Sequence, residues 1–143
     1  MPNTPQIRVL IADDHQLFAE ALGLTLDADP RLEVVGFARD GREVIELAQQ
    51  LEPDVILMDL DMPVFDGLTA TQKLLKAAPA RVAILTASTS PEDALHAHDA
   101  GASAFLTKGC STKEVVDAVL ELGAPESLGL RPNPLQFRAT LTH

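Results

Sequence analysis

The sequence predicts a doubly wound α/β domain, in which a five-stranded parallel sheet is covered by helices on both faces. Five short segments are almost wholly apolar, as strands buried on both faces are. Segments whose apolar residues follow the helical spacing alternate with them, which is typical of a parallel sheet. The chain has 143 residues, of which 46% are hydrophobic, and this is enough for one domain with a packed core.

The predicted strands consist mainly of Val, Ile, Leu and Ala. They cover residues 7–12 (IRVLIA), 32–38 (LEVVGFA), 54–59 (DVILMD), 81–87 (RVAILTA) and 103–108 (SAFLTK). Trp and Tyr are absent and only five Phe are present. We therefore expect an aliphatic core.

The first three predicted helices have recognisable ends. Pro30 cannot continue the first helix, whose apolar residues are spaced for one face: Leu17, Phe18, Ala21, Leu22 and Leu26. Asp40 caps the second helix and Pro53 ends it, and its apolar stripe is Val44, Ile45, Ala48 and Leu51. The third helix runs from Asp66 to Lys76, with four residues inward: Leu68, Thr71, Leu74 and Leu75.

The last two predicted helices have stronger start signals. Ser90 and Pro91 begin a helix over about 91–100 that is rich in Ala and has few large apolar residues, so we expect it to be weakly packed. Ser111 and Glu114 have the spacing of a capping box, and one apolar face comes after it: Val115, Val116, Val119 and Leu120. Gly and Pro punctuate the chain after this helix. We therefore expect a domain over 1–122 and a linker or tail over 123–143.

Charge and cysteine content exclude several classes of protein. The net charge is −10, which argues against binding of nucleic acid by this chain alone. The single cysteine, Cys110, excludes an internal disulfide and a Cys-based zinc cluster. No apolar run has the length of a membrane span, and the N-terminus lacks the features of a signal peptide. We expect a cytoplasmic protein without membrane association.

Polar side chains collect at the carboxyl ends of the predicted strands. Asp13 and Asp14 come directly after the first strand, Asp59 ends the third, Thr86 lies near the end of the fourth and Lys108 ends the fifth. The carboxyl ends of parallel strands meet at one edge of a sheet, where ligands bind. We therefore expect these five side chains to lie together.

The collected side chains predict a magnesium-dependent phosphoryl-transfer site. Clustered carboxylates raise one another's pKa values unless a cation lies between them. Mg²⁺ suits such a cluster because it prefers oxygen ligands and is held by carboxylates and phosphate. Lys108 adds a positive charge and Thr86 a hydroxyl donor. A carboxylate such as Asp59 can be the nucleophile and form an acyl phosphate.

With these residues in place, the chain resembles a known family, the receiver domain of two-component response regulators, over about residues 7–122. The matching text is ADDH (12–15), MDLDMPVFDG (58–67), ILTAS (84–88) and AGASAFLTKG (100–109). The resemblance implies a flavodoxin-like sheet with strand order 2-1-3-4-5. It also implies a phosphorylation switch rather than a turnover enzyme.

The resemblance implies functional roles residue by residue. Asp59 is the expected phosphoacceptor. Asp13, Asp14, Asp59 and the backbone carbonyl of Asp61 are the expected ligands of Mg²⁺. Lys108 is expected to contact the phosphoryl group and Thr86 to move toward it. Phe105 matches the aromatic residue that turns inward as the threonine moves.

The residues of the motifs also indicate a subfamily. ADDHQLFAEAL (12–22) and PDVILMDLDMP (53–63) are similar to the NarL/FixJ type, whose members usually carry a LuxR-type helix-turn-helix domain after a linker. The resemblance implies a sensor histidine kinase as partner, a homodimer formed on phosphorylation, and control of transcription. That further domain would bind the DNA. Residues Leu141–His143 would come directly before it in the sequence.

Several alternatives remain open on the sequence alone. A single-domain regulator that acts by protein–protein contact is one. A haloacid-dehalogenase-like phosphatase would use Asp59 and Asp61, but its motif has Thr or Val where this chain has Pro63. A flavodoxin relative is disfavoured because ADDH lacks the small residues that wrap a phosphate.

Asp61 adds negative charge beside the site, so we hypothesise that it alters the lifetime of the phosphorylated form. His15 is interpreted as packing at a helix start and not as a ligand.

Overall fold

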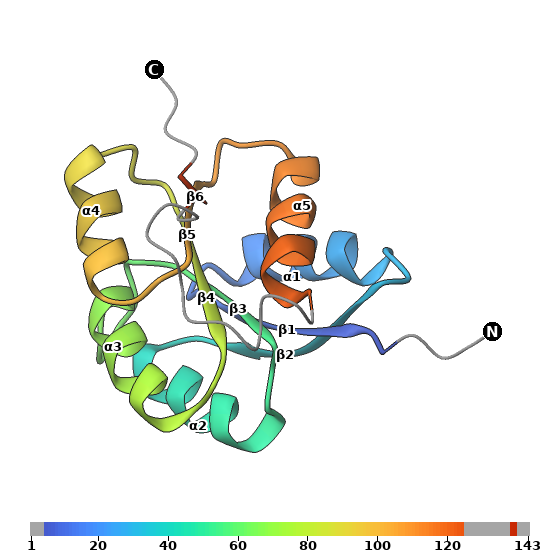
Figure 1. Cartoon of the computed structure of the whole chain (residues 1–143), viewed down its shortest axis with the longest axis horizontal. Coiled ribbons are helices and arrows are strands. Elements are labelled where there is room, and N and C mark those ends of the chain that lie inside the picture. Colours follow the sequence, from blue (N-terminus) through green and yellow to red (C-terminus); the bar gives the residue numbers. More distant parts are fainter. Residues whose placement is uncertain (1–4, 125–137, 140–143) are drawn as a thin grey trace.

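One parallel sheet of six strands forms the centre of the computed structural model, which describes residues 5–124 and 138–139 (Figure 1). The strand order is β2-β1-β3-β4-β5-β6, and every neighbouring pair is parallel. The strands are β1 (Ile7–Ala12), β2 (Leu32–Ala38), β3 (Val55–Met58), β4 (Arg81–Thr86), β5 (Ala104–Thr107) and β6 (Arg138–Ala139). The predicted order 2-1-3-4-5 is confirmed for the first five strands.

Five helices cover the two faces of the sheet. They are α1 (Gln16–Asp27), α2 (Gly41–Leu51), α3 (Gly67–Ala77), α4 (Pro91–Asp99) and α5 (Thr112–Gly123). Figure 1 shows α1 and α5 on one face and α2, α3 and α4 on the other. This is the doubly wound arrangement that the alternation of strands and helices predicts.

Each face of the sheet has its own apolar core, because successive side chains of a strand point to opposite faces. In β1, Val9 and Ile11 pack under α1 and α5, whereas Leu10 and Ala12 pack under α2, α3 and α4. The core is aliphatic as expected, with one fully buried aromatic residue among those described, Phe105. None of the described helices is long and apolar enough to cross a bilayer.

Four predicted helix starts are confirmed by hydrogen bonds from backbone N–H groups to the capping side chain. Asp40 accepts from the N–H groups of Arg42 and Glu43. The other three caps each accept one such bond: Asp66, Ser90 and Ser111. These bonds satisfy amide groups that have no partner within their own helix.

Helix α1 differs from its predicted single apolar face. Leu26 is fully buried and Phe18 is partly buried on the sheet side, but Leu17 and Leu24 are 85% and 78% exposed. Ala21 lies between them and is also exposed. Apolar residues thus occur on both sides of this helix, and the sequence pattern does not separate the buried ones from the exposed ones.

Strand β6 was not predicted. It lies in the segment that we expected to be a linker, and it pairs with β5 so that Arg138 is beside Ala104 and Ala139 beside Phe105. Two residues without an apolar or β-branched pattern leave no strand signal in a sequence. The rest of the expected linker, 125–137 and 140–143, lies outside the described residues.

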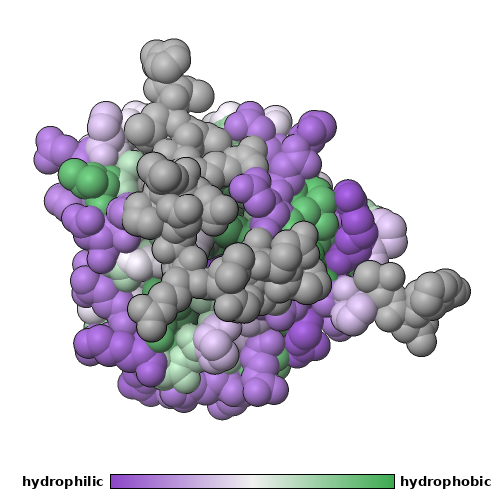
Figure 2. Space-filling view, in the orientation of Figure 1, coloured by the Kyte–Doolittle hydropathy of each residue, from purple (hydrophilic) through white to green (hydrophobic). Residues whose placement is uncertain are grey.

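The surface of the described residues is mainly polar on the side shown in Figure 1. Figure 2 gives the same orientation, and most of the part that is coloured by hydropathy is hydrophilic, with hydrophobic residues in small separate groups. An acidic chain with its apolar residues in the two cores is expected to have such a surface.

Candidate functional site

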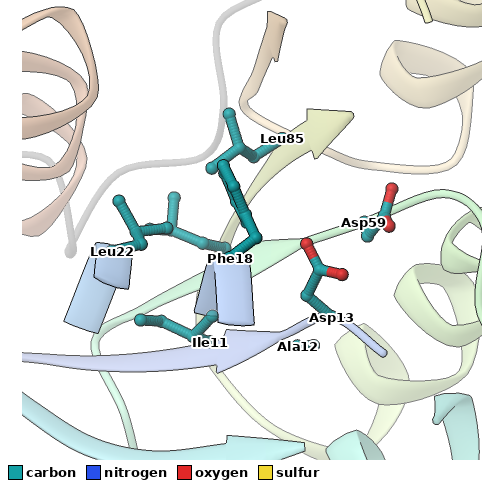
Figure 3. Close-up of a pocket in the computed structure, with 8 residues that line it drawn as sticks. Ile11, Ala12, Asp13, Phe18, Leu22, Asp59 and Leu85 are labelled. Atoms are coloured by element: carbon teal, nitrogen blue, oxygen red, sulfur yellow. The ribbon is translucent and has the colours of Figure 1, made fainter. Parts of the chain in front are cut away.

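The predicted polar residues do come together at the carboxyl edge of the sheet. Asp13 comes directly after β1, Asp59 directly after β3 and Lys108 directly after β5. The Lys108 Nζ lies 2.8 Å from Asp13 Oδ2 and 3.3 Å from Asp59 Oδ2. Asp13 and Asp59 are only 5% and 2% exposed. Figure 3 shows the two carboxyl groups side by side at the ends of their strands.

Backbone hydrogen bonds that continue the strand ladders fix these positions. The N–H of Asp13 donates to the carbonyl of Ala38 (3.0 Å), and the N–H of Asp59 donates to the carbonyl of Ala12 (2.9 Å). The N–H of Lys108 donates to the carbonyl of Thr86 (2.7 Å). Each functional side chain is therefore held one step beyond a rigid strand, where its rotamer and not its backbone is free to change.

Gly67, the first residue of α3, allows this helix to approach the end of β3. A Cβ atom at Gly67 would lie 2.2 Å from the carbonyl oxygen of Asp59, which is closer than any van der Waals contact. The N–H of Gly67 donates to the carbonyl of Leu60 at 2.8 Å. The glycine thus keeps the loop after Asp59 short and tightly closed.

The carboxyl group of Asp59 has a perturbed pKa. Burial raises its pKa above the ordinary value, and the negative charge of Asp13 raises it further. Lys108 and the N–H of Asp61 oppose this rise, since both stabilise the ionised form; the Asp61 nitrogen lies 3.4 Å from Asp59 Oδ1. A buried carboxylate at a sheet edge with a raised pKa marks a candidate functional group.

Lys108 supplies the positive charge that the buried carboxylates need. Burial by itself would lower the pKa of Lys108, but its hydrogen bond to Asp13 and the charges of Asp59 and Asp13 raise the pKa above its ordinary value. The ammonium group also lies 4.5 Å from the centroid of the Phe18 ring, within the range of a cation–π interaction. Lys108 is therefore ionised, and its ammonium group contacts Asp13, Asp59 and the ring of Phe18.

A small hollow with a mostly apolar wall lies behind the two carboxyl groups (Figure 3). Phe18 and Leu22 of α1 form one side, and Ile11 and Leu85 of the sheet form the other. This wall contributes to the burial that raises the pKa of Asp59. Phe18 was expected only as part of a helix face, and its contact with Lys108 has no signal in the sequence.

The donor atoms around Asp59 fit a divalent cation. One ligand atom each from Asp13, Asp14, His15 and Asp59 lies within 4.8 Å of all the others. Asp14 and His15 are exposed and therefore reach the group from the solvent side. The side chain of Asp61 is exposed as well. Three carboxylates that can face one ion are a suitable donor set for Mg²⁺.

The other two predicted site residues, Thr86 and Phe105, lie on the strands β4 and β5 in different settings. Thr86 is fully buried, and its Oγ1 accepts a hydrogen bond from the N–H of Ser88 at 3.4 Å. The Ser88 hydroxyl donates to the Asp93 carboxylate of α4, so the end of β4 is connected to that helix. Phe105 is 0% exposed, already turned inward, and belongs to the same core cluster as Ala94 and Ala97 of α4.

Comparison with known proteins identifies the family. The family model of the response regulator receiver domain matches residues 9–120. The chain belongs to this family.

Its relatives carry different domains beside the receiver. The transcriptional regulatory protein LiaR of Bacillus subtilis is 39% identical over 114 residues, which are 79% of this chain and 54% of LiaR. The protein-glutamate methylesterase/protein-glutamine glutaminase 2 of Photobacterium profundum is 42% identical over 71% of this chain and 26% of its own length. The chain thus spans about a quarter to a half of the curated relatives it matches.

Solved receiver domains have the same fold. The receiver domain of the response regulator NarL from Mycobacterium tuberculosis has a TM-score of 0.81 and 35% identity, over 84% of this chain and 98% of that one. The predictions of family and fold are therefore confirmed. The relatives include transcriptional regulators and an enzyme whose match is confined to a quarter of its length, which agrees with a receiver that acts as a switch and not as a catalyst.

Proposed function

We propose that this receiver domain is a phosphorylation switch in which Asp59 accepts a phosphoryl group from a sensor histidine kinase. One observation carries the proposal: the Asp59 carboxylate is 2% exposed, faces the Lys108 ammonium at 3.3 Å, and lies at the mouth of the sheet among the carboxylates of Asp13 and Asp14. A buried carboxylate that is offset by a single lysine is costly as a purely structural element. It is well suited as a nucleophile whose product needs positive charge around it.

The proposed transfer is a single in-line displacement. An Oδ atom of Asp59 attacks the phosphorus of a kinase phosphohistidine and forms a P–O bond. The P–N bond breaks, its electron pair stays on the imidazole, and that ring takes up a proton. Lys108 stabilises the negative charge on the transferred group, and water later hydrolyses the acyl phosphate to restore the Asp59 carboxylate.

Asp13, Asp14, Asp59 and the backbone carbonyl of Asp61 would hold Mg²⁺. The support is the chemistry of the donor set, since carboxylate and carbonyl oxygens are the ligands that this ion prefers. When bound, the ion would offset the charge of the phosphoryl oxygens together with Lys108.

The proposed switch is carried by Thr86, Lys108 and Phe105. Phosphorylation adds a group with nearly two negative charges and strong acceptor oxygens, which would draw the Thr86 hydroxyl away from Ser88 and toward Asp59. We propose that the inward position of Phe105 in this structure is the one that phosphorylation favours. Helix α4 would then move, because Ala94 and Ala97 are its only buried residues in the described structure.

Helix α1 offers a surface for the kinase. Leu17, Ala21 and Leu24 form an exposed apolar stripe on the helix that begins shortly after the acidic residues Asp13 and Asp14. Burial of such a stripe by a partner would place its phosphohistidine near the site. Scattered exposed apolar residues need no explanation, but residues at i, i+4 and i+7 share one helix face.

The proposed output is control of transcription by a homodimer in the cytoplasm. In this proposal residues 1–122 form the receiver and 123–143 a linker toward a LuxR-type helix-turn-helix domain, which would carry all contact with DNA. The similarity to LiaR supports this output. A receiver that acts only through protein–protein contact is the second candidate, and the similarity to a protein-glutamate methylesterase, which is not named as a transcriptional regulator, supports keeping it.

Intact mass after incubation with acetyl phosphate and Mg²⁺ tests the proposal. One added phosphoryl group is expected in the wild-type chain, and none in Asp59→Asn or in the presence of EDTA. Asp61→Asn is the matched control, because it makes the same chemical change two residues away and must still be labelled.

Failure to label has to be separated from rapid hydrolysis. Beryllofluoride, a stable mimic of the phosphoryl group, is expected to bind the wild-type chain with Mg²⁺ and not to bind Asp59→Asn. If neither acetyl phosphate nor beryllofluoride modifies the wild-type chain, the proposed function is wrong. Continuous release of phosphate without a trapped adduct would instead indicate the phosphatase alternative.

A further inference from the structure

His15 lies over the acidic mouth of the site. Its Nδ1 atom is 3.2 Å from Asp13 Oδ1, 3.5 Å from Asp14 Oδ1 and 3.8 Å from Asp59 Oδ2. The side chain is 67% exposed, so packing does not force the ring into this position. His15 does stand at a helix start, as interpreted, but its exposed side chain is not packed there.

His15 also does not serve the helix that it precedes. It occupies the N-cap position of α1, where Ser, Thr, Asp or Asn would satisfy a free amide group, but its side chain makes no capping hydrogen bond. Its own N–H donates to Asp13 Oδ1 at 2.8 Å. The backbone is thus tied to Asp13, and the ring lies among the carboxylates and beside the Lys108 ammonium, whose Nζ is 3.5 Å from His15 Nδ1, instead of facing the helix.

The distances around Nδ1 are those of atoms that can share one metal ion. Bonds of about 2.1 Å place two ligand atoms about 3.0 Å apart at a right angle and about 3.4 Å apart at the tetrahedral angle. The three distances from His15 Nδ1 to carboxylate oxygens, 3.2, 3.5 and 3.8 Å, lie at or slightly above this range. Small rotamer changes of the exposed His15 and Asp14 side chains would bring Nδ1 and a carboxylate oxygen within reach of one ion.

We infer that His15 is a further metal ligand of this site and that it makes the site selective for transition-metal ions over Mg²⁺. This rests on the proposed function, because the carboxylates are the same ones. Imidazole suits Co²⁺, Ni²⁺ and Zn²⁺, whereas Mg²⁺ prefers oxygen and retains its waters. If His15 took one position on such an ion, that position would not be available to a phosphoryl oxygen on Asp59.

A role as a simple hydrogen-bond partner of Asp13 makes a different prediction. Loss of such a partner changes the carboxylate, which binds both kinds of ion, so the affinities for Mg²⁺ and Co²⁺ would change together. Loss of an imidazole ligand changes only the ion that uses it. The ratio of the two affinities therefore distinguishes a ligand from a neighbour.

The test is calorimetric titration of the untagged chain with Mg²⁺ and with Co²⁺. The variant is His15→Ser, which removes the imidazole and supplies a side chain suited to an N-cap. The control is His96→Ser, which removes an exposed histidine of α4 far along the chain. We expect His15→Ser to weaken Co²⁺ binding by about tenfold or more and to leave Mg²⁺ binding within about twofold. The visible absorption of bound Co²⁺ is expected to change in His15→Ser and not in His96→Ser.

Each remaining outcome is decisive. If the wild-type chain binds Mg²⁺ and accepts a phosphoryl group, but Co²⁺ affinity and absorption are the same in His15→Ser, the inference is wrong and the proposed function stands. Parallel loss of affinity for both ions also overturns it. If the wild-type chain binds neither ion, the inference and the proposed magnesium site fall together.

Discussion

Neutralising Asp59 is expected to stabilise the protein, although it destroys the proposed phosphoacceptor. In Asp59→Asn the side chain keeps its shape and loses its charge. Lys108 at 3.3 Å attracts that charge by about 5 kcal/mol at an effective dielectric constant of about 20. Asp13, with an oxygen within 4.8 Å, repels it by at least about 3.5 kcal/mol on the same basis. The two neighbours therefore nearly cancel.

The cost of burying the charge then decides whether Asp59→Asn raises or lowers the free energy of unfolding. Removing a carboxylate from water costs several kcal/mol even after relaxation, which exceeds the small net attraction. We expect Asp59→Asn to raise the free energy of unfolding at pH 7 by about 1–2 kcal/mol, or the melting temperature by about 3–8 °C. The assay is urea and thermal unfolding monitored by circular dichroism, in EDTA, with Asp61→Asn as control. That control removes an exposed charge of the same loop and is expected to change stability by less than about 0.5 kcal/mol.

The pH dependence gives a second check on the same reasoning. The folded-state pKa of Asp59 lies above the ordinary value of 3.8, so the folded state binds this proton more tightly than the unfolded state. The ionised group therefore destabilises the fold fully above its folded pKa, and this destabilisation disappears as the pH falls toward 3.8. The advantage of Asp59→Asn must shrink in that window. An Asn variant that is less stable than wild type at pH 7, or an advantage that grows in acid, would refute the argument.

Three other variants probe the site and its loops. Lys108→Ala is expected to slow labelling by acetyl phosphate about 100-fold, measured as intact mass against time; a rate near that of wild type would remove Lys108 from the mechanism. Val64 has a positive φ of 72° and is 65% exposed, so Val64→Asn should relieve backbone strain and stabilise the fold by about 1 kcal/mol in urea unfolding. A destabilised variant would contradict this. Asp61→Asn is expected to change the decay rate of phosphorylated Asp59, measured by mass after removal of the phosphodonor; equal rates would show that the acid at this position is only solvated.

The sheet and the position of the site could be predicted because both depend on strand geometry. Buried parallel strands are apolar on both faces, and residues that come directly after them must meet at one edge. The sequence alone therefore predicts that Asp13, Asp59 and Lys108 lie together. Capping by Asp40 and Ser90 was equally local, since each cap needs only the next three residues.

The unpredicted features depend on side-chain direction or on very short contacts. Leu17 and Leu26 are identical in a sequence pattern, and only the docking angle of α1 decides which of them is buried. The ring of His15 lies beside Asp13 and Lys108, which no spacing rule reports. The left-handed conformation of Val64 is unexpected in a β-branched residue, and β6 is too short to leave a pattern.

The sharing of Lys108 between two buried carboxylates explains both why the site lowers the stability of the fold and how it is proposed to work. Lys108 is shared between Asp13 at 2.8 Å and Asp59 at 3.3 Å, so one ammonium serves two buried carboxylates and the site carries excess negative charge. A cation that binds at Asp59, or a phosphoryl group attached to it, would therefore act on a carboxylate that neighbouring negative charge already destabilises. Helix α4 has few buried side chains. It is linked to the end of β4 by hydrogen bonds through Ser88 and Asp93. The carboxyl edge of the sheet has unfavourable electrostatics, and the adjoining helix α4 buries few side chains. A local change of charge needs both conditions in order to shift the position of a surface helix.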